Sequence, residues 1–436
     1  MKTKNGIIFL ILAAMLILPE FGCTDKVITK RKFTGNIPVY MTYETLRSYP
    51  VGSAEASEIG TPGKLFFYNN YIFVNEVFKG IHIINNTDPS NPQNIGFIDI
   101  PGNVDMAVKN NVLYADSYVD LLAFDISDMN NVSLLTRIND VFTYEIPPYD
   151  PNFPVATIDP SQGLVTGYTI GEVEERFIED NTNSDNWTLF GGMKDDVSLA
   201  ETNSFSGGGD GKASSVAIAG SLARFMVYQD YLYTINEQEI FVFDLSNNSA
   251  PVKTSNTVST WWDIETLFSY NNHLFVGSRN GMLIYSLAQA SNPTYVSSIS
   301  HLESCDPVVV QGNTAFVTLR AGNDCGNTLS QLDVIDITNY SNPQLLTSYA
   351  MTEPYGLGID DEVLFICDGS AGLKIYNVSD LYSINQNMIA HFPNINTFDV
   401  IPHNNILMMI GSDGLYQYDY SDLQNIQLLS FIGIGE

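Results

Sequence analysis

The chain has 436 residues, of which 44% are hydrophobic and only 16% are charged, so it can bury a sizeable core and is no disordered polyelectrolyte. Asp and Glu number 49 against 19 Lys and Arg, which gives a formal net charge of -30. A charge of that sign repels phosphate backbones, and this excludes nucleic acid as an expected partner.

The amino terminus has the pattern of an export signal. Lys2 and Lys4 precede an apolar stretch over residues 7–18, and a small residue and a cysteine follow it. A stretch of that length is too short to span a bilayer. We predict a cleaved signal peptide over residues 1–22, which places the folded chain outside the cytoplasm.

The end of that segment resembles the lipobox at which bacterial lipoproteins are cut and acylated. Gly22 directly precedes Cys23, although Glu20 and Phe21 stand where the family usually has Leu and a small residue. The resemblance implies lipidation of Cys23 and a lipid anchor in the cell envelope, which we expect to lie in the outer membrane. Residues 23–56 then form a tether and N-terminal arm. An ordinary secretory signal, in which Cys23 has no role, is the alternative.

The rest of the chain is built from a repeat of about 42 residues, the size of one propeller blade. The longest interval between units, from Tyr114 to Tyr233, holds one unit plus the inserted residues 143–222. A hydrophobic pair after an Asn- or Asp-containing turn marks the seven units, at Phe73, Tyr114, Tyr233, Phe275, Phe316, Phe365 and Met408.

Each unit contains an apolar third strand whose last residue is, with one exception, Asp or Asn. One example runs over residues 332–336 and ends at Asp336, and Ser341-Asn342-Pro343 completes the turn after it. Asp or Asn at the strand end can bond its own following backbone, which ends the strand without a distant partner. Proline in the turn cannot extend the hydrogen-bond ladder.

Four short antiparallel strands per unit, repeated seven times, predict an all-β fold: a seven-bladed β-propeller of four-stranded antiparallel blades. We expect it to form a single domain over residues 57–436. The strands and turns resemble the LVIVD repeat family of exported bacterial proteins, especially over residues 101–108 and 114–120. That resemblance covers residues 57–434. It implies a propeller at the envelope or cell surface and supplies no reaction or substrate.

The insertion over residues 143–222 lies between blades 2 and 3. It begins rich in proline, has a strand-like run over residues 164–170 and ends in a glycine-rich run over residues 207–211. Because it lacks the third-strand signature, we count no eighth blade. It joins an outer strand to the next inner strand, on the face that carries the loops between second and third strands. This face, here called the top face, is the usual place for binding or catalysis.

Motifs for catalysis, cofactors or metals are almost absent. Residues 207–212 are superficially like a phosphate loop, but Ser206 replaces its first glycine and Ala213 its hydroxyl residue. The histidines are scattered without zinc spacing, at His82, His273, His301, His391 and His403. We therefore predict no catalytic residue, no cofactor and no metal, and we expect a monomer.

Two classes of function remain. The first is a non-catalytic binding or scaffold module that takes a protein or glycan through the top face, favoured because no catalytic constellation emerges. The second is an extracytoplasmic carbohydrate-active hydrolase or lyase that uses top-face carboxylates as acid and base. A catalytic site should hold carboxylates in a closed cleft with a perturbed pKa, whereas a binding face should be broad and aromatic.

The cysteines other than Cys23 have separate expected roles. Cys305 precedes the inner strand of blade 5, and Cys325 lies in the loop between the second and third strands of that blade. Both belong to the top face, so in an oxidising compartment we predict a disulfide between them. Two free thiols are the alternative. Cys367 is expected to be a buried apolar side chain.

The candidate binding face surrounds the mouth of the propeller channel. Counting back nine residues from each repeat marker places charged side chains at the starts of several inner strands, which line the axis. We expect them to converge on a narrow wet entrance, with pairing among themselves as their alternative role. Adjacent strand residues point to opposite faces, so one tryptophan of the neighbouring pair should pack inward. The alternative is that both tryptophans pack under the insertion. The candidates are Lys64, Asp105, Asp116, Tyr118, Arg224, Trp261, Trp262, Arg279, Arg320 and Asp399.

Overall fold

The computed structural model describes residues 27–144, 146–179, 217–300, 307–321 and 329–435. The described residues form two compact units. The first contains those up to residue 40 and those from residue 149 to 179, and the second contains the remainder. The predicted lipidation site Cys23 and the predicted disulfide partners Cys305 and Cys325 lie outside the described residues.

The first unit is a two-stranded sheet with a short loop. Strand β1 (Val27–Met41) pairs with β11 (Leu164–Glu179), which contains the strand-like run noted in the sequence. The 3₁₀ turn η1 (Pro160–Gln162) precedes β11. Asn36 fixes the loop, since its Nδ2 donates to the carbonyl oxygens of Asp150 and Phe153 at 2.9 and 2.7 Å.

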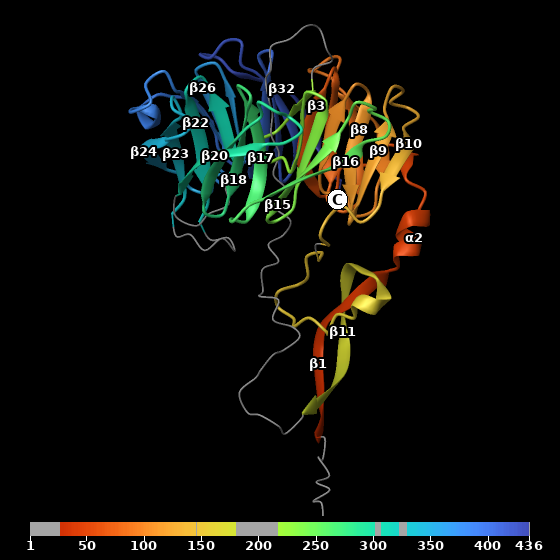
Figure 1. Cartoon of the computed structure of the whole chain (residues 1–436). Coiled ribbons are helices and arrows are strands. Elements are labelled where there is room, and N and C mark those ends of the chain that lie inside the picture. Colours follow the sequence, from red (N-terminus) through yellow and green to blue (C-terminus); the bar gives the residue numbers. More distant parts are fainter. Residues whose placement is uncertain (1–26, 145, 180–216, 301–306, 322–328, 436) are drawn as a thin grey trace, which may run out of the picture. The chain divides into compact units, whose positions relative to one another are not determined.

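The second unit is a propeller of seven antiparallel sheets, as predicted (Figure 1). Blades 1 and 2 comprise β3 (Pro62–Tyr68), β4 (Tyr71–Glu76), β5 (Gly80–Asn85) and β6 (Gln93–Asp99), then β7 (Met106–Lys109), β8 (Val112–Ser117), β9 (Asp120–Asp125) and β10 (Ser133–Ile138). Blades 3 and 4 comprise β13 (Phe225–Tyr228), β14 (Tyr231–Ile235), β15 (Glu239–Asp244) and β16 (Val252–Ser259), then β17 (Ile264–Tyr270), β18 (His273–Ser278), β19 (Gly281–Ser286) and β20 (Thr294–Ser300).

The remaining three blades follow the same order. Blades 5 and 6 comprise β21 (Val308–Gln311), β22 (Thr314–Leu319), β23 (Gln331–Asp336) and β24 (Gln344–Ala350), then β25 (Leu357–Asp360), β26 (Val363–Cys367), β27 (Leu373–Asn377) and β28 (Met388–Phe392), with the 3₁₀ turn η2 (Ile384–Gln386) before β28. Blade 7 comprises β29 (Thr397–His403), β30 (Ile406–Gly411), β31 (Gly414–Asp419) and β32 (Gln427–Gly433).

The inner strands close a ring around the axis. Each packs beside the inner strands of its two neighbours, and β29 of the last blade packs beside β3 of the first. Buried apolar side chains fill the space between blades, such as Phe275 of blade 4 and Phe316 of blade 5, which share one core cluster. Burial on both faces explains why the third strands are apolar throughout rather than alternating.

Local turn chemistry ends the third strands as the sequence predicts. Oδ1 of Asp336 accepts the backbone N–H of Thr338 at 2.8 Å, and Asp125 and Asp244 do the same two residues ahead. Beyond this turn, the pairing of the third and fourth strands shifts register in every blade. Such bulges increase strand twist, which turns the outer strands away from flat edge-to-edge pairing.

Blade 1 carries two extra strands. The sequence boundary at residue 57 leaves out helix α2 (Tyr43–Ser48) and strand β2 (Gly52–Ala54), and β2 pairs with the outer strand β6. Strand β12 (Ala217–Ala219), at the end of the insertion, pairs with the inner strand β3. Because β12 pairs with the axial edge of β3, it occupies part of the central channel that seven four-stranded blades alone would enclose.

The ring closes without exchanging a strand between its first and last blades. All four strands of blade 7 come from one continuous stretch of chain. An isolated parallel bridge joins Ile59 to Ile434, and Gly435 N donates to Ile59 O at 2.8 Å. We call this junction of blades 1 and 7 the seam.

Candidate functional site

A short segment crosses the propeller axis where the sequence predicts a wet entrance. This axial segment, residues 217–224, includes β12 and touches several blades. Gly220 N donates to Leu65 O of blade 1 at 3.2 Å. Ser221 N donates to Asp399 Oδ1 at 3.0 Å, and Leu357 N donates to Ser221 Oγ at 2.7 Å. The segment therefore binds the starts of the inner strands in blades 1, 6 and 7, where we expected solvent.

Lys64 and Asp105 form a buried ion pair beside the axial segment. The Nζ–Oδ2 distance is 2.6 Å, and the two side chains are only 1% and 3% exposed. The same Oδ2 accepts the backbone N–H of Arg224 at 2.6 Å, and Oδ1 accepts that of Met106 at 2.6 Å. Burial lowers the pKa of Lys64, and the Asp105 charge opposes this shift. The two charges pair with each other, the alternative role named above, and their burial excludes a wet entrance around this pair.

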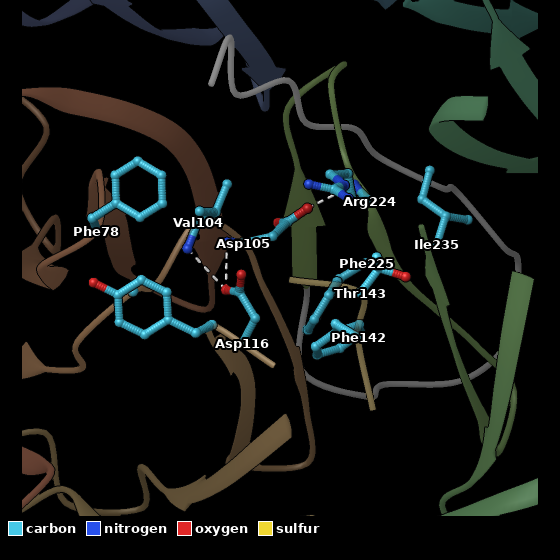
Figure 2. A pocket seen from close by; sticks show the side chains of 11 residues that line it. Phe78, Val104, Asp105, Asp116, Phe142, Thr143, Arg224, Phe225 and Ile235 are labelled. Atoms are coloured by element: carbon cyan, nitrogen blue, oxygen red, sulfur yellow. Dashed lines mark hydrogen bonds between the residues drawn. The ribbon is translucent and has the colours of Figure 1, made fainter. Parts of the chain in front are cut away.

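Asp116 lies next to this pair and is half-buried. Its Oδ1 accepts three N–H groups at 2.8 Å, from the Asn103 side chain and the backbones of Val104 and Asp105. Figure 2 shows the two backbone hydrogen bonds. Burial raises the pKa of Asp116 to about 7, and the Asp105 charge adds to the rise although the backbone hydrogen bonds oppose it. Asp116 can therefore exchange a proton near neutral pH.

A small pocket opens above Asp116, here called the Asp116 pocket. Its volume is about 30 Å³, which is room for little more than a water molecule. The rings of Phe78 and Tyr118 stack on one side with centroids 6.3 Å apart, and Phe142 and Phe225 pack on the other (Figure 2). The other lining residues are Gly102, Val104, Asp105, Thr143, Arg224 and Ile235.

Glycine at position 102 makes this arrangement possible. Its φ is 77°, and an added Cβ would lie 2.3 Å from the Tyr118 ring. Any other residue would push the ring away and strain the backbone. Burial raises the pKa of Tyr118 to about 12, so its hydroxyl stays protonated and can donate a hydrogen bond.

Four of the ten predicted residues line this pocket, a fifth pairs with one of them, and three others lie in other blades. Lys64, Asp105, Asp116, Tyr118 and Arg224 form the cluster described above. Asp399 is buried and accepts hydrogen bonds from Ser221. The Arg320 guanidinium is buried over the Tyr355 ring at 4.0 Å, and Arg279 Nε lies 3.6 Å from Glu265 Oε1.

One tryptophan of the pair is exposed and the other packs inward, although both lie in the bend between β16 and β17 and not in a strand. Trp261 is 55% exposed, whereas Trp262 packs against the apolar core of blades 3 and 4. Trp261 makes an edge contact of 4.8 Å with Tyr295, which lies on the outer strand β20. The exposed tryptophan therefore belongs to an aromatic patch with an outer-strand residue, and it does not line the Asp116 pocket.

Sequence reasoning missed several lining side chains. Phe78 and Phe142 form the aromatic walls, and Asn103 holds the carboxylate. Asn103 lies inside the run over residues 101–108 that resembles the LVIVD repeats, and this resemblance is the signal that could have identified it. Phe142 lies just before the insertion, where the repeat pattern has already ended, and nothing local marks it.

Other chemical possibilities in the described ranges are few. Among those residues, no group of three His, Cys, Asp or Glu side chains lies close enough to hold a metal ion. Cys367 is buried as expected, and burial raises its pKa well above the usual value. None of the helices in the same ranges is long and apolar enough to cross a membrane.

The fold is similar to that of solved propellers. No protein-family model matches the chain. No curated protein matches it either. The periplasmic gluconolactonase PpgL of Pseudomonas aeruginosa is 10% identical, with 85% of this chain and 96% of that chain covered and a TM-score of 0.52. A protein from Lactobacillus plantarum is 11% identical, with 86% and 96% covered and a TM-score of 0.51. At such low identity these similarities establish the propeller fold alone.

Proposed function

We propose that the chain is a non-catalytic binding module of the cell envelope, which holds part of a protein or glycan in the Asp116 pocket. In this proposal a lipid on Cys23 anchors the chain, in the outer membrane, as its lipobox-like sequence implies. The resemblance of its repeats to the LVIVD family supports the same location. The pocket lies on the top face, where loops between second and third strands meet those before the inner strands.

One observation carries the proposal: the carboxylates at the pocket are held by donors from their own chain. Asp105 accepts hydrogen bonds from Lys64 and from two backbone N–H groups, and one oxygen of Asp116 accepts three N–H groups. Such carboxylates shape the site rather than attack a substrate. The pocket admits one projecting group, such as a hydroxyl or a short side chain, because its volume is far below that of a drug-sized site.

A carbohydrate-active hydrolase or lyase is the second candidate, and one observation favours it. A carboxyl group whose pKa is raised to about 7 can serve as a general acid or base at neutral pH. A propeller of the same fold is a gluconolactonase, so this architecture supports hydrolysis as well as binding. The small pocket and the donors around both carboxylates argue against a closed catalytic cleft.

The experiment uses the full chain purified in mild detergent, applied to a glycan array. Asp116→Asn and Tyr118→Ala should each abolish retention of the bound glycans, while the chain stays folded by circular dichroism. Tyr382→Ala is the matched control, since Tyr382 is exposed in blade 6 and far along the chain from the pocket. Retention that is equal in all variants would refute the pocket as the site.

A second measurement separates binding from catalysis. The same chain is incubated with each retained glycan, and new reducing ends are counted over time. The binding proposal expects no product above that of the Asp116→Asn variant. Product formation that disappears in Asp116→Asn would establish the hydrolase instead.

A further inference from the structure

A larger cavity lies at the seam, on the face opposite the Asp116 pocket. Its volume is about 550 Å³. Its walls come from the turns between the first and second strands of blades 1 and 7 and from the turn after the third strand of blade 1. Antiparallel strands place these turns on the face opposite the loops that form the Asp116 pocket. The lining residues are Phe67, Asn69, Asn70, Asn86, Thr87, Pro89, His403, Asn404, Ile406 and Met408.

The lining of this seam cavity combines polar and apolar side chains and carries no formal charge at neutral pH. Its polar groups, which both donate and accept hydrogen bonds, are those of Asn69, Asn70, Asn404 and Thr87, whereas the amide of Asn86 is bonded to Gln417. Among the described residues, no acidic residue, lysine or arginine lines the cavity. Burial lowers the pKa of His403, so its imidazole is neutral at pH 7. In a chain with a net charge of -30, an uncharged concavity is a distinct chemical environment.

Two contacts make the cavity walls rigid. The amides of Asn86 and Gln417 exchange hydrogen bonds of 2.9 and 2.7 Å across the seam. The His403 ring packs on Phe67 with centroids 5.0 Å apart, and its Nε2 pairs with Asn404 Nδ2 at 2.8 Å. The cavity is therefore formed before a ligand arrives, which lowers the entropic cost of binding.

We propose that the seam cavity binds a neutral sugar, as a monosaccharide or disaccharide. The volume falls within the range of small-molecule sites. Hydroxyl groups need partners that donate and accept, which asparagine amides supply, while the apolar C–H face of a sugar packs on side chains such as Phe67 and Met408. A phosphate or carboxylate ligand would lack a cationic partner there, and an ammonium ligand would lack an anionic one.

Single amide side chains can be removed from the cavity wall without changing the backbone, because two of the lining asparagines lie in left-handed turns. Asn69 and Asn404 have φ values of 55° and 50°, a conformation that glycine adopts without strain. Replacing either by glycine deletes the side chain and keeps the turn. Asn271 occupies the same turn of blade 4, with a φ of 44°, and lies away from the cavity. Asn271→Gly is therefore a matched control.

The test measures binding of individual sugars to the full chain in detergent. Glucose, galactose, mannose, N-acetylglucosamine, maltose and cellobiose are the probes, with glucuronate and inorganic phosphate as charged comparisons. Saturation-transfer NMR detects binding, and titration gives the Kd. We expect at least one neutral sugar to bind and to raise the melting temperature, because it contacts both blades at the seam. In Asn404→Gly and Asn69→Gly its Kd should rise at least tenfold, and in Asn271→Gly it should not change.

Three outcomes would overturn this inference. One is no binding of any neutral sugar at 20 mM, a concentration on the order of weak monosaccharide sites. Another is tighter binding of glucuronate or phosphate than of neutral sugars. The third is binding that is lost in Tyr118→Ala and kept in Asn404→Gly, which would assign the sugar to the Asp116 pocket. The proposals for the seam cavity and for the Asp116 pocket can fail independently, because each is tested with its own set of variants.

Discussion

Gly220 lies so close to the Asp399 carboxylate that a Cβ added to the glycine would sit 2.1 Å from Oδ2. The two residues are far apart in the chain, and their approach brings the axial segment onto the inner strand of blade 7. Ser221 then donates its N–H to the other carboxylate oxygen. The buried Asp399 thus holds the chain across the axis instead of facing water.

Gly220→Ala should destabilise the propeller. The added methyl group has no space, because it meets a buried carboxylate, so we expect a loss of about 1–3 kcal/mol in the free energy of unfolding. Urea denaturation measures it. Gly167→Ala is the control, since a Cβ at Gly167 meets nothing within 4 Å. Equal stability of the two variants would contradict the close approach.

Gln417→Leu should weaken the seam. The change removes both bonds to Asn86 and leaves that buried amide unsatisfied, which costs about 1–3 kcal/mol. Gln427→Leu serves for comparison, because Gln427 is exposed and bonds only within its own turn. If the two variants unfold at the same urea concentration, the amide pair does not hold the ring closed.

Lys64→Met should be among the most damaging single changes in the propeller. Removing the cation leaves the buried Asp105 charge without its partner, and broken buried pairs cost about 3–5 kcal/mol. The matched change Lys79→Met removes an exposed partner of Glu76 and should cost about 0–1 kcal/mol. Chemical denaturation of both variants measures these losses in the free energy of unfolding. A small loss in Lys64→Met would indicate that the ion pair is exposed to water.

The stability of the chain should depend on pH through Asp116. Burial raises the pKa of this carboxyl from 3.8 to about 7, so between these values the folded state binds a proton that the unfolded state has lost. Its contribution to the free energy of unfolding is present below about pH 4 and is lost as the pH rises through 7. Asp116→Asn should remove that dependence. The free energy of unfolding of the variant, relative to that of the wild type, should therefore rise between pH 4 and 7.5. Urea midpoints at four pH values test this, with Asp128→Asn as a surface control; a constant difference would refute it.

Cys23→Ala should release the protein from the membrane fraction or leave it as an uncleaved precursor. The expectation follows from the lipobox-like residues before Cys23, since an acylated cysteine carries the anchor. Fractionation of cells and intact mass measure the two consequences. Unchanged membrane association and unchanged mass would exclude lipidation at this residue.

The sequence was informative wherever structure follows from local chemistry. The strand ending at Asp336 is predictable because the carboxylate bonds the N–H of Thr338, two residues away. The repeat spacing then places Lys64 and Asp105 at the starts of inner strands. Their burial was not predictable, since it depends on the axial segment, which carries no repeat signature.

Contacts between distant segments account for the rest of what sequence reasoning missed. Strand β12 has only three residues, and its partner β3 lies about 150 residues earlier in the chain. Trp261 shows the same limit. The sequence predicts that one tryptophan of the pair packs inward, but it does not reveal that Tyr295 of β20 lies beside the exposed one.

The position of the axial segment in the chain has a consequence for the order of assembly. Residues 217–224 are synthesised after blades 1 and 2 and before blades 3 to 7. Until blade 7 exists, the inner edge of β3 is already covered by β12 and cannot recruit a strand from another molecule. The late blades then close around a segment that carries specific partners for Asp399 and Leu357. Correct closure of the ring is thereby distinguished from a misplaced blade 6 or 7, because such a misplacement would cost Ser221 one of these two partners.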